Sequence, residues 1–149
     1  MALQTSVGTE HAIGVPGDLF VPDQAMYYPS NLLAASGGVT CGKFVYLSSG
    51  QATNTPSGAP LGIAQRNLSY PLMTVTNGAS LVIPEGYPVQ TISKGDVIVE
   101  ATDSATVGAS VYVNASGAIV TSSASGAVDT GWKVAQGGVS GGYIVIYNH

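Results

Sequence analysis

The fold of this chain is decided by a stretch in its C-terminal half, Ser110-Val111-Tyr112-Val113-Asn114-Ala115-Ser116-Gly117-Ala118-Ile119. Val111 and Val113 alternate with their neighbours in the period of two that is typical of a half-buried β-strand. The turn-forming residues that follow include Gly117, which can take the positive φ that a tight hairpin turn requires. The stretch therefore predicts a β-hairpin.

Short segments of the same kind lie on both sides of this hairpin. In one of them we expect Val97 and Val99 on one face of a strand, with Asp96, Ile98 and Glu100 on the other. The segments are rich in Val, Ile, Tyr and Thr, which fit a pleated surface. We predict strands at Thr40–Leu47, Leu61–Arg66, Ser80–Ile83, Tyr87–Ile92, Asp96–Ala101, Ser110–Asn114, Ala118–Thr121, Trp132–Ala135 and Tyr143–Tyr147.

Turn residues separate the predicted strands, and no long apolar segment has helical spacing. We predict turns at Pro84–Gly86, Ser93–Asp96, Ala115–Gly117 and Gly137–Gly138, and we interpret Gln51–Gly58 as a long polar loop. Short strands at this spacing are typical of all-β proteins. We therefore expect an all-β fold, a small β-barrel or sandwich body with an extended N-terminal arm.

The chain divides into this arm, residues 1–38, and a β-barrel or sandwich domain, residues 39–149. The first part contains three prolines and short apolar segments without a period of 2 or 3.6. We interpret it as an extended segment whose apolar side chains dock on the surface of a partner. The residues that we expect to contact the partner are Leu3, Val7, Ile13, Leu19, Phe20, Tyr27 and Tyr28.

Charged residues are scarce, with four Lys or Arg and eight Asp or Glu among 149 residues. They make up 8% of the chain, against about 25% in soluble globular domains. A free-standing monomer usually keeps its surface charged, so we expect this surface to be covered by copies of the chain or by a larger assembly. The uncharged segment Tyr143–Tyr147 would be an aggregation hazard as an open edge strand. We expect it to be central in the sheet or paired at an interface.

Composition also excludes several classes of partner. The net charge is −4, and the basic residues Lys43, Arg66, Lys94 and Lys133 are scattered singly, which argues against direct binding to nucleic acid. No apolar stretch is long enough to span a membrane, and no secretory signal pattern is present, so we expect synthesis in a cytoplasm. Cys41 is the one cysteine, and we expect it to be a small buried hydrophobe.

Two motifs look like catalytic signatures but lack the context that the chemistry needs. Gly37–Lys43 matches part of a phosphate-binding loop, but Phe44 follows where Ser or Thr would hold magnesium. Gly138–Gly142 matches G-x-S-x-G, but a predicted strand follows where a hydrolase has a helix. His11 and His149 stand at opposite ends of the chain, and neither belongs to a cluster of three or four candidate metal ligands. We therefore expect no catalytic, cofactor or metal site, and a protein that is not an enzyme.

Several segments resemble the structural cement, or capsid decoration, proteins of tailed bacteriophages. They are MALQTSVGTEHAIGVPGDL (1–19), Gly37–Phe44, Leu61–Arg66 and Ala79–Val89, while Val107–Val113, Gly117 and Trp132–Ala135 are similar to the β-hairpin repeat of phage head decoration modules. The resemblance implies a β-rich body, often in trimers on the outside of the head. It also implies binding across boundaries between major capsid protein subunits, with an N-terminal arm that reaches a capsid loop. It brings no cofactor and no catalytic residue.

We therefore expect a virion structural protein that decorates and stabilises the capsid from its outer face. Its partners would be the major capsid protein and two further copies of itself in a homotrimer, and it would be made in the cytoplasm of the bacterial host. An alternative is a carbohydrate-binding β module on a virion, supported only by Trp132 and the tyrosines. A third reading, a nucleotide hydrolase of the dUTPase kind, needs more charged groups than one Arg and three Lys.

Overall fold

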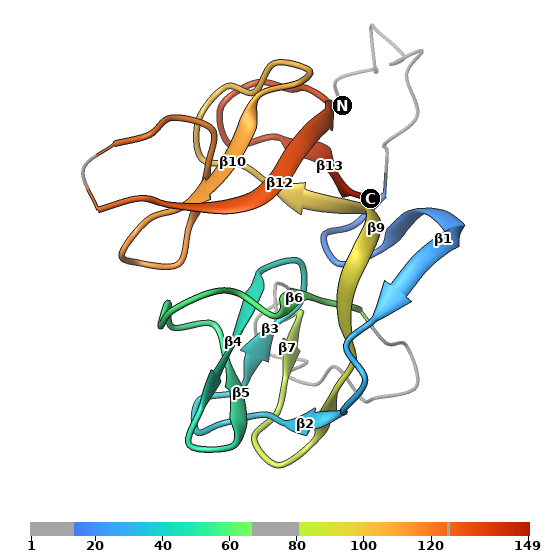
Figure 1. The fold of residues 1–149 in the computed structure, drawn as a ribbon, viewed down its shortest axis with the longest axis vertical. Helices are drawn as coiled ribbons and strands as arrows, with labels where there is room; N and C mark the ends of the chain where they lie inside the picture. The colour runs from blue at the N-terminus through green and yellow to red at the C-terminus, as the bar shows by residue number, and fades with distance from the viewer. Residues whose placement is uncertain (1–13, 67–80, 125) are drawn as a thin grey trace, which may run out of the picture.

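The chain folds into β-strands joined by short turns. A computed structural model describes residues 14–66, 81–124 and 126–149, and these residues form thirteen strands and no helix (Figure 1). The strands are β1 (Leu19–Tyr27), β2 (Leu32–Leu33), β3 (Val39–Thr40), β4 (Phe44–Ser48), β5 (Gln51–Thr53), β6 (Gly62–Ala64), β7 (Val82–Ile83), β8 (Pro88–Val89), β9 (Thr91–Glu100), β10 (Ser110–Val113), β11 (Ile119–Val120), β12 (Val128–Gln136) and β13 (Tyr143–Asn148). The prediction of an all-β fold is confirmed.

Strand β9 organises the sheet. One edge of β9 pairs with β6 near Ile92 and then with β13 from Gly95 to Glu100, both antiparallel. Its other edge pairs with β1, because Asp96 has both Tyr147 and Val21 as partners. The strand order in this curled nine-stranded sheet is β11-β10-β12-β13-β9-β6-β4-β5, with β1 beside β9. Two small sheets, β2–β8 and β3–β7, complete the described strands.

The strands make two lobes that share β9 (Figure 1). One lobe holds β10 to β13, and the other holds β2 to β8. Strand β4 links two hydrophobic clusters, since Phe44 and Tyr46 face one of them and Val45 faces the other. We call the first cluster the main core. It contains Ile63 and Ile92 together with buried residues of the β10–β13 lobe. The lobes therefore share one core.

The second cluster, which we call the small core, lies within the β2–β8 lobe. It consists of Ala34, Val39, Cys41, Val45, Ala52, Ala64, Ile83 and Val89, with Leu32 and Leu81 packed against it. Each strand of two or three residues in this lobe contributes one apolar side chain to the small core.

The hairpin that the sequence predicts at Ser110–Ile119 is confirmed. Val113 pairs with Ile119, and Gly117 has a φ of 85° in the turn between β10 and β11. Val111 and Val113 are both buried in the main core. The terminal strand β13 lies between β12 and β9, so its predicted central position is also confirmed.

Two predictions about loops are wrong. The turn predicted at Ser93–Asp96 is part of the continuous strand β9, because Gly95 takes a φ of 133° that lets the strand bend without ending. The polar loop predicted at Gln51–Gly58 begins with strand β5, which forms a hairpin with β4. Ser49 and Gly50, both at positive φ, make its two-residue turn.

Part of the predicted arm lies among the described residues. Residues 14–38 pack on this same chain: β1 pairs with β9, β2 pairs with β8, and Ala34 is buried in the small core. The boundary at residue 38 stays a prediction. None of the described residues belongs to a helix that is long and apolar enough to cross a membrane.

Candidate interaction surface

Strand β1 has no buried residue, unlike the other strands of the nine-stranded sheet. Six of its nine residues are exposed, against two of ten in the neighbouring strand β9. The exposed fractions are 47% for Phe20, 59% for Met26 and 40% for Tyr27. We call the six exposed residues, Phe20, Pro22, Asp23, Gln24, Met26 and Tyr27, the β1 surface. Because apolar side chains gather here on one strand, β1 is the leading candidate for a contact surface.

The middle of β1 leaves the ladder as a bulge. Val21 pairs with Asp96 and Met26 pairs with Lys94, so five steps along β1 match two steps along β9. The segment Pro22–Ala25, which we call the β1 bulge, therefore projects from the edge of the sheet, as Figure 1 shows. Bulges of this kind are common at sheet edges, where they end the pairing and redirect side chains.

The base of the bulge is held by close packing on β9. A Cβ atom placed on Gly95 would lie 3.2 Å from the Cα of Ala25, so the two backbones approach at a glycine. The Ser93 hydroxyl donates a hydrogen bond to the Met26 carbonyl at 3.1 Å. These contacts fix the C-terminal end of the bulge, and Asp23 lies exposed at its middle.

An ion pair anchors the chain just before β1. The Arg66 guanidinium donates from Nε and Nη2 to the two oxygens of Asp18, at 2.8 and 2.9 Å. The Asp18 carboxylate raises the pKa of Arg66 through these hydrogen bonds. In addition, the Arg66 amide donates to the Gly17 carbonyl at 3.0 Å. The start of β1 is thus fixed by a bidentate contact of the strong type.

Local sequence patterns do not reveal this pair, because 48 positions separate Asp18 from Arg66. The one available signal was the rarity of charge itself. Because the chain has four basic residues among 149, Arg66 at the end of a predicted strand is a candidate for a specific structural contact.

The seven residues predicted to contact a partner fall into three groups. Leu3, Val7 and Ile13 lie outside the described residues. Phe20 and Tyr27 belong to the β1 surface. Leu19 is partly buried and packs against the main core, and Tyr28 is partly buried, with its amide donating to the Thr91 carbonyl at 2.8 Å. Strand β1 thus brings Phe20 and Tyr27 to one edge of the sheet.

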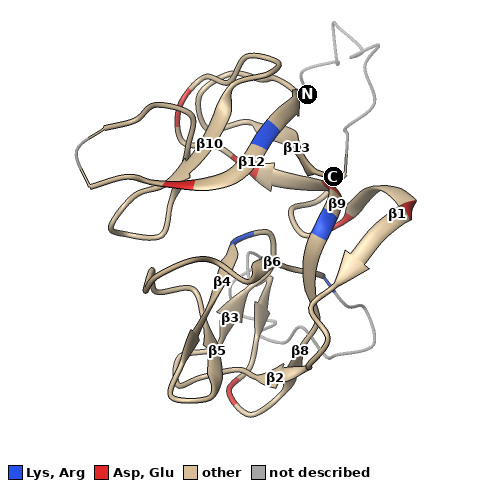
Figure 2. Ribbon diagram, in the orientation of Figure 1, with Lys and Arg blue, Asp and Glu red and all other residues tan. Residues whose placement is uncertain are grey.

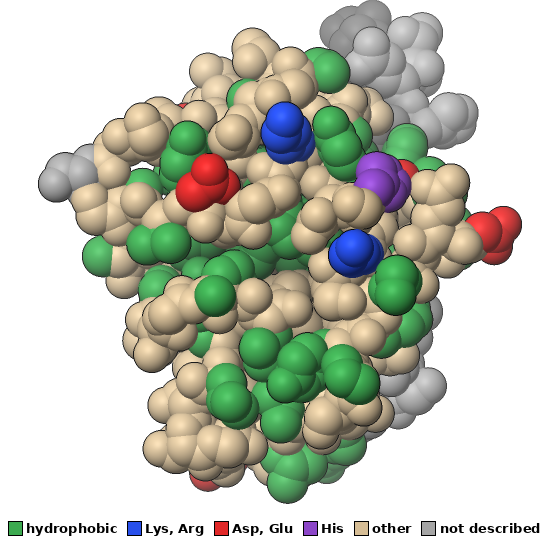
Figure 3. All heavy atoms as spheres, viewed as in Figure 1, with side chains coloured by type: hydrophobic (Ala, Val, Ile, Leu, Met, Phe, Trp, Pro, Cys, Tyr) green, Lys and Arg blue, Asp and Glu red, His purple; other side chains and the backbone are tan. Residues whose placement is uncertain are grey.

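Charged side chains are spread thinly over the molecule (Figure 2). On the face in Figure 3, apolar side chains form patches among polar side chains and backbone, and the charged side chains lie singly. His149 Nε2 lies 3.3 Å from a carboxylate oxygen of Asp96. The His149 ring stacks on the Tyr147 ring. Asp23, by contrast, has no hydrogen bond or ion pair with any residue that the structure describes. It is an exposed, uncompensated charge within the β1 surface.

The residues that resemble catalytic motifs have structural roles. Gly37–Lys43 leads through turns and β3 into strand β4, as predicted. In the Gly138–Gly142 turn, the Ser140 hydroxyl donates to the Thr102 carbonyl at 2.7 Å, and strand β13 follows. No group of three or more His, Cys, Asp or Glu side chains in the described ranges could hold a metal ion.

Cys41 is buried in the small core, as expected from the sequence. Its side chain is 2% exposed, and its thiol lies 3.6 Å from the Gln65 carbonyl. Burial raises the pKa of the thiol to about 11. The thiolate, which is the reactive form, is therefore disfavoured in the folded protein.

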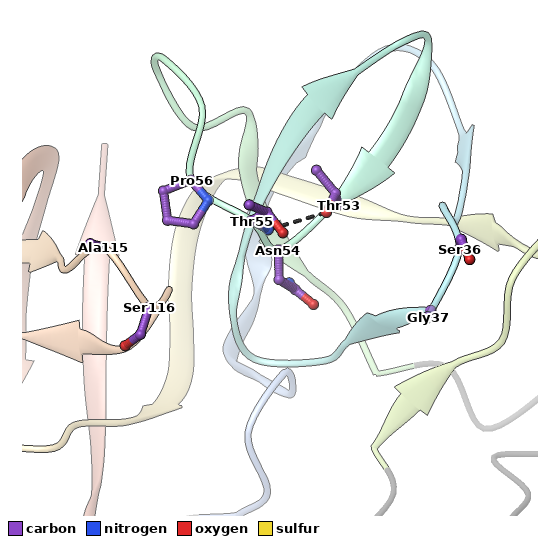
Figure 4. Close-up of a pocket in the computed structure, with 9 residues that line it drawn as sticks. Ser36, Gly37, Thr53, Asn54, Thr55, Pro56, Ala115 and Ser116 are labelled. Carbon is purple, nitrogen blue, oxygen red and sulfur yellow. Dashed lines mark hydrogen bonds between the residues drawn. The ribbon is translucent and has the colours of Figure 1, made fainter.

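A hollow of about 400 Å³ lies between the two lobes (Figure 4). It is lined by Ser36, Gly37, Gly38, Thr53, Asn54, Thr55, Pro56, Ala115 and Ser116. The Asn54 amide accepts from Thr40 N at 2.6 Å and donates to the Phe44 carbonyl at 3.0 Å. The backbone of Asn54 also lies close to Gly117, where a Cβ would approach it to 3.1 Å. The polar side chain of Asn54 thus joins the surrounding turns.

Trp132 does not offer a platform for a sugar ring. Trp132 is 2% exposed and meets the Phe44 ring edge-on, while Tyr46 is buried in the same core. A sugar-binding platform presents an aromatic face to solvent, so Trp132 no longer supports the carbohydrate-binding alternative.

The architecture defines an all-β protein with an exposed, partly apolar strand beside β9 at the edge of its sheet. A sequence profile of the family described as "Structural cement protein (E217 gp24/Pam3 gp6)" matches residues 3–148. The chain belongs to this family of phage structural cement proteins, so it is a structural protein of the phage particle.

A solved structure with the same fold is one titled "The capsid of Myoviridae Phage XM1". A chain of that structure aligns with a TM-score of 0.69 over 99% of this chain and 97% of its own length, at 18% sequence identity. No curated protein matches the chain.

Proposed function

We propose that this protein decorates the outer face of the phage capsid and stabilises it by binding across neighbouring major capsid protein subunits. The observation that carries the proposal is the exposed apolar β1 surface on a chain in which 8% of residues are charged. Membership of the cement family supports a capsid as the object that covers this surface.

The stabilisation follows from linkage. A protein that binds the assembled shell and not the separated subunits shifts the equilibrium toward the shell. Contacts made through apolar side chains and strand edges lose little affinity to salt, in contrast to contacts made through ion pairs. A surface with few charges suits this way of binding.

The proposed contact residues are Leu3, Val7, Ile13, Leu19, Phe20, Tyr27 and Tyr28, which belong to the predicted arm at 1–38. Phe20 and Tyr27 would make direct contact through the β1 surface. Leu19 packs on the main core, so we propose that it supports β1 from behind. The body at 39–149 would form a homotrimer, and synthesis would take place in the cytoplasm of the bacterial host.

The test uses shells of the major capsid protein that lack this protein. Purified full-length protein is added, bound and free fractions are separated by sedimentation, and the melting temperature of the shell is measured. We expect saturable binding and a higher melting temperature. Cryo-electron microscopy of the decorated shell then shows whether each copy spans a subunit boundary. Absence of binding to intact shells would contradict the proposal.

The trimer is tested separately by sedimentation equilibrium of the isolated protein. We expect a mass three times that of one chain. A concentration-independent monomer would contradict the trimer without contradicting decoration of the shell.

A further inference from the structure

We propose that the β1 bulge is a projecting contact element that inserts into a depression on the shell, with Asp23 paired to a basic side chain of the shell. The inference rests on the proposed function and deepens it, because it names the chemistry of the partner surface. It is argued from the shape of β1, from its apolar flanks and from the charge at its middle.

The shape of the element is set by the register of β1. Five steps along β1 match two along β9 between Val21 and Met26, so the intervening residues cannot all pair and must project. Pro22 lacks an amide hydrogen, which prevents a further strand from pairing at this position. The β1 bulge is therefore unsuited to strand addition and suited to insertion as a convex element.

The flanks of the bulge are apolar. Phe20 precedes it, and Met26 and Tyr27 follow it, and all three side chains are at least 40% exposed. Aromatic and Met side chains are enriched in protein–protein interfaces relative to the rest of the surface. The complementary surface is an apolar depression with room for an aromatic ring and a flexible Met side chain.

The charge at the middle of the bulge selects the partner. Asp23 makes no ion pair with the described residues, whereas Asp18 pairs with Arg66 and Asp96 lies near His149. If Asp23 entered an apolar depression alone, its desolvation would oppose binding. A Lys or Arg of the partner at the base of the depression would offset this desolvation and fix the orientation of binding.

The same charge disfavours a twofold contact between two copies. Bringing β1 against β1 of a second copy would place two Asp23 carboxylates near each other, and β1 itself contains no basic residue. Like charges at a contact oppose association. We therefore assign the bulge to the shell.

The experiment compares full-length wild-type protein with Asp23→Lys in the shell-binding assay at low and high salt. We expect Asp23→Lys to weaken binding at least about tenfold at low salt, with a smaller difference at high salt, because the charge repulsion is screened. Glu85→Lys makes the same charge change at an exposed turn in the β2–β8 lobe, and we expect it to bind like wild type.

A second pair of variants tests the apolar flanks. Met26→Ser should weaken binding several-fold, whereas Val139→Ser, at a residue that is 76% exposed in the other lobe, should not. Thermal unfolding of each variant checks that the fold is retained. These variants keep the inference testable even if Asp23→Lys alters the local backbone.

The outcomes separate the two proposals. If wild type binds shells and both Asp23→Lys and Met26→Ser bind equally well, the inference is overturned and the proposed function stands. If wild type does not bind, the proposed function fails and the inference fails with it. If Asp23→Lys changes the sedimentation of the isolated protein and leaves shell binding unchanged, the occupant is a second copy, which also overturns the inference.

Discussion

The rings of Phe44 and Trp132 meet edge to face, with 6.0 Å between their centroids and 80° between their planes. Phe44 belongs to β4 in one lobe, and Trp132 belongs to β12 in the other. Because both side chains are buried, this contact joins the two lobes inside the main core. It explains why the single Trp of the chain serves packing and not ligand recognition.

We predict that Trp132→Ala lowers the free energy of unfolding by about 3–5 kcal/mol, the usual effect of removing a large buried aromatic side chain. Chemical denaturation followed by circular dichroism measures the change. In a double-mutant cycle with Phe44→Leu, the two changes should be coupled by about 0.5–1.5 kcal/mol. Additive effects would show that the ring contact itself contributes nothing.

Gly62→Ala should prevent normal pairing of β6 with β9. Its φ is 154°, and a Cβ atom there would clash with the backbone oxygen of Ile92, at 2.1 Å. Relief requires movement of backbone, so we expect a loss of more than about 3 kcal/mol in stability. Gly58→Ala is the matched control, because it also has a positive φ but nothing within 4 Å of the added atom. Equal losses in the two variants would mean that strain in φ, and not the clash, governs both.

Arg66→Gln should loosen the start of β1. The variant removes the bidentate contact to Asp18 and leaves that carboxylate partly buried without its cation. We expect a loss of about 1 kcal/mol in global stability. Hydrogen exchange should accelerate most at the Ile98 amide, which donates to the Asp18 carbonyl at 3.0 Å. Uniform acceleration over the whole sheet would contradict this local role, and Lys133→Gln serves as the control for loss of an exposed cation.

Cys41 should make the protein less stable in alkali. Below pH 9.0 the thiol is neutral in both states, whereas between 9.0 and about 11 the unfolded chain ionises and the folded chain does not. Unfolding then releases a proton, so stability falls as pH rises through this window, by at most about 2–3 kcal/mol. Burial also raises the pKa of Tyr46, so Tyr46→Phe is a needed comparison.

The measurement is the free energy of unfolding as a function of pH, from pH 8 up to about pH 11, which is the pKa of the buried thiol. We expect Cys41→Ala to be less dependent on pH than wild type, and Tyr46→Phe to remove only the part that Tyr46 contributes. An identical pH dependence in Cys41→Ala and wild type would show that the thiol does not ionise on unfolding in this range.

The sequence predicts best those elements whose pattern is local. Val111, Val113 and Gly117 specify a hairpin through alternation and a turn, and the structure has that hairpin. The sequence predicts a turn within the long strand β9, because Ser93-Lys94-Gly95-Asp96 has turn composition. Pairing on both edges of β9 overrides this composition, and such pairing depends on residues far away in the chain.

The candidate surface was only partly predictable for a similar reason. Phe20 and Tyr27 belong to short apolar segments without a period, which predicts contact with a partner, and both side chains are exposed. The bulge between them follows from the close approach of Ala25 to Gly95, two residues that are 70 positions apart by their numbers. The role proposed for Asp23 depends on its position in that bulge and on its lack of an ion pair, and neither can be read from the sequence.

Strand β9 also determines how the molecule would respond to mechanical load. It pairs with β1 along one edge and with β6 and β13 along the other. A pull on β1 along the strand direction would strain several β1–β9 hydrogen bonds together, in shear, and would not open them one at a time. The load would then divide between β6 in one lobe and β13 in the other. Separating β1 from the body in this direction therefore requires the paired segments on both sides of the β1 bulge to fail together.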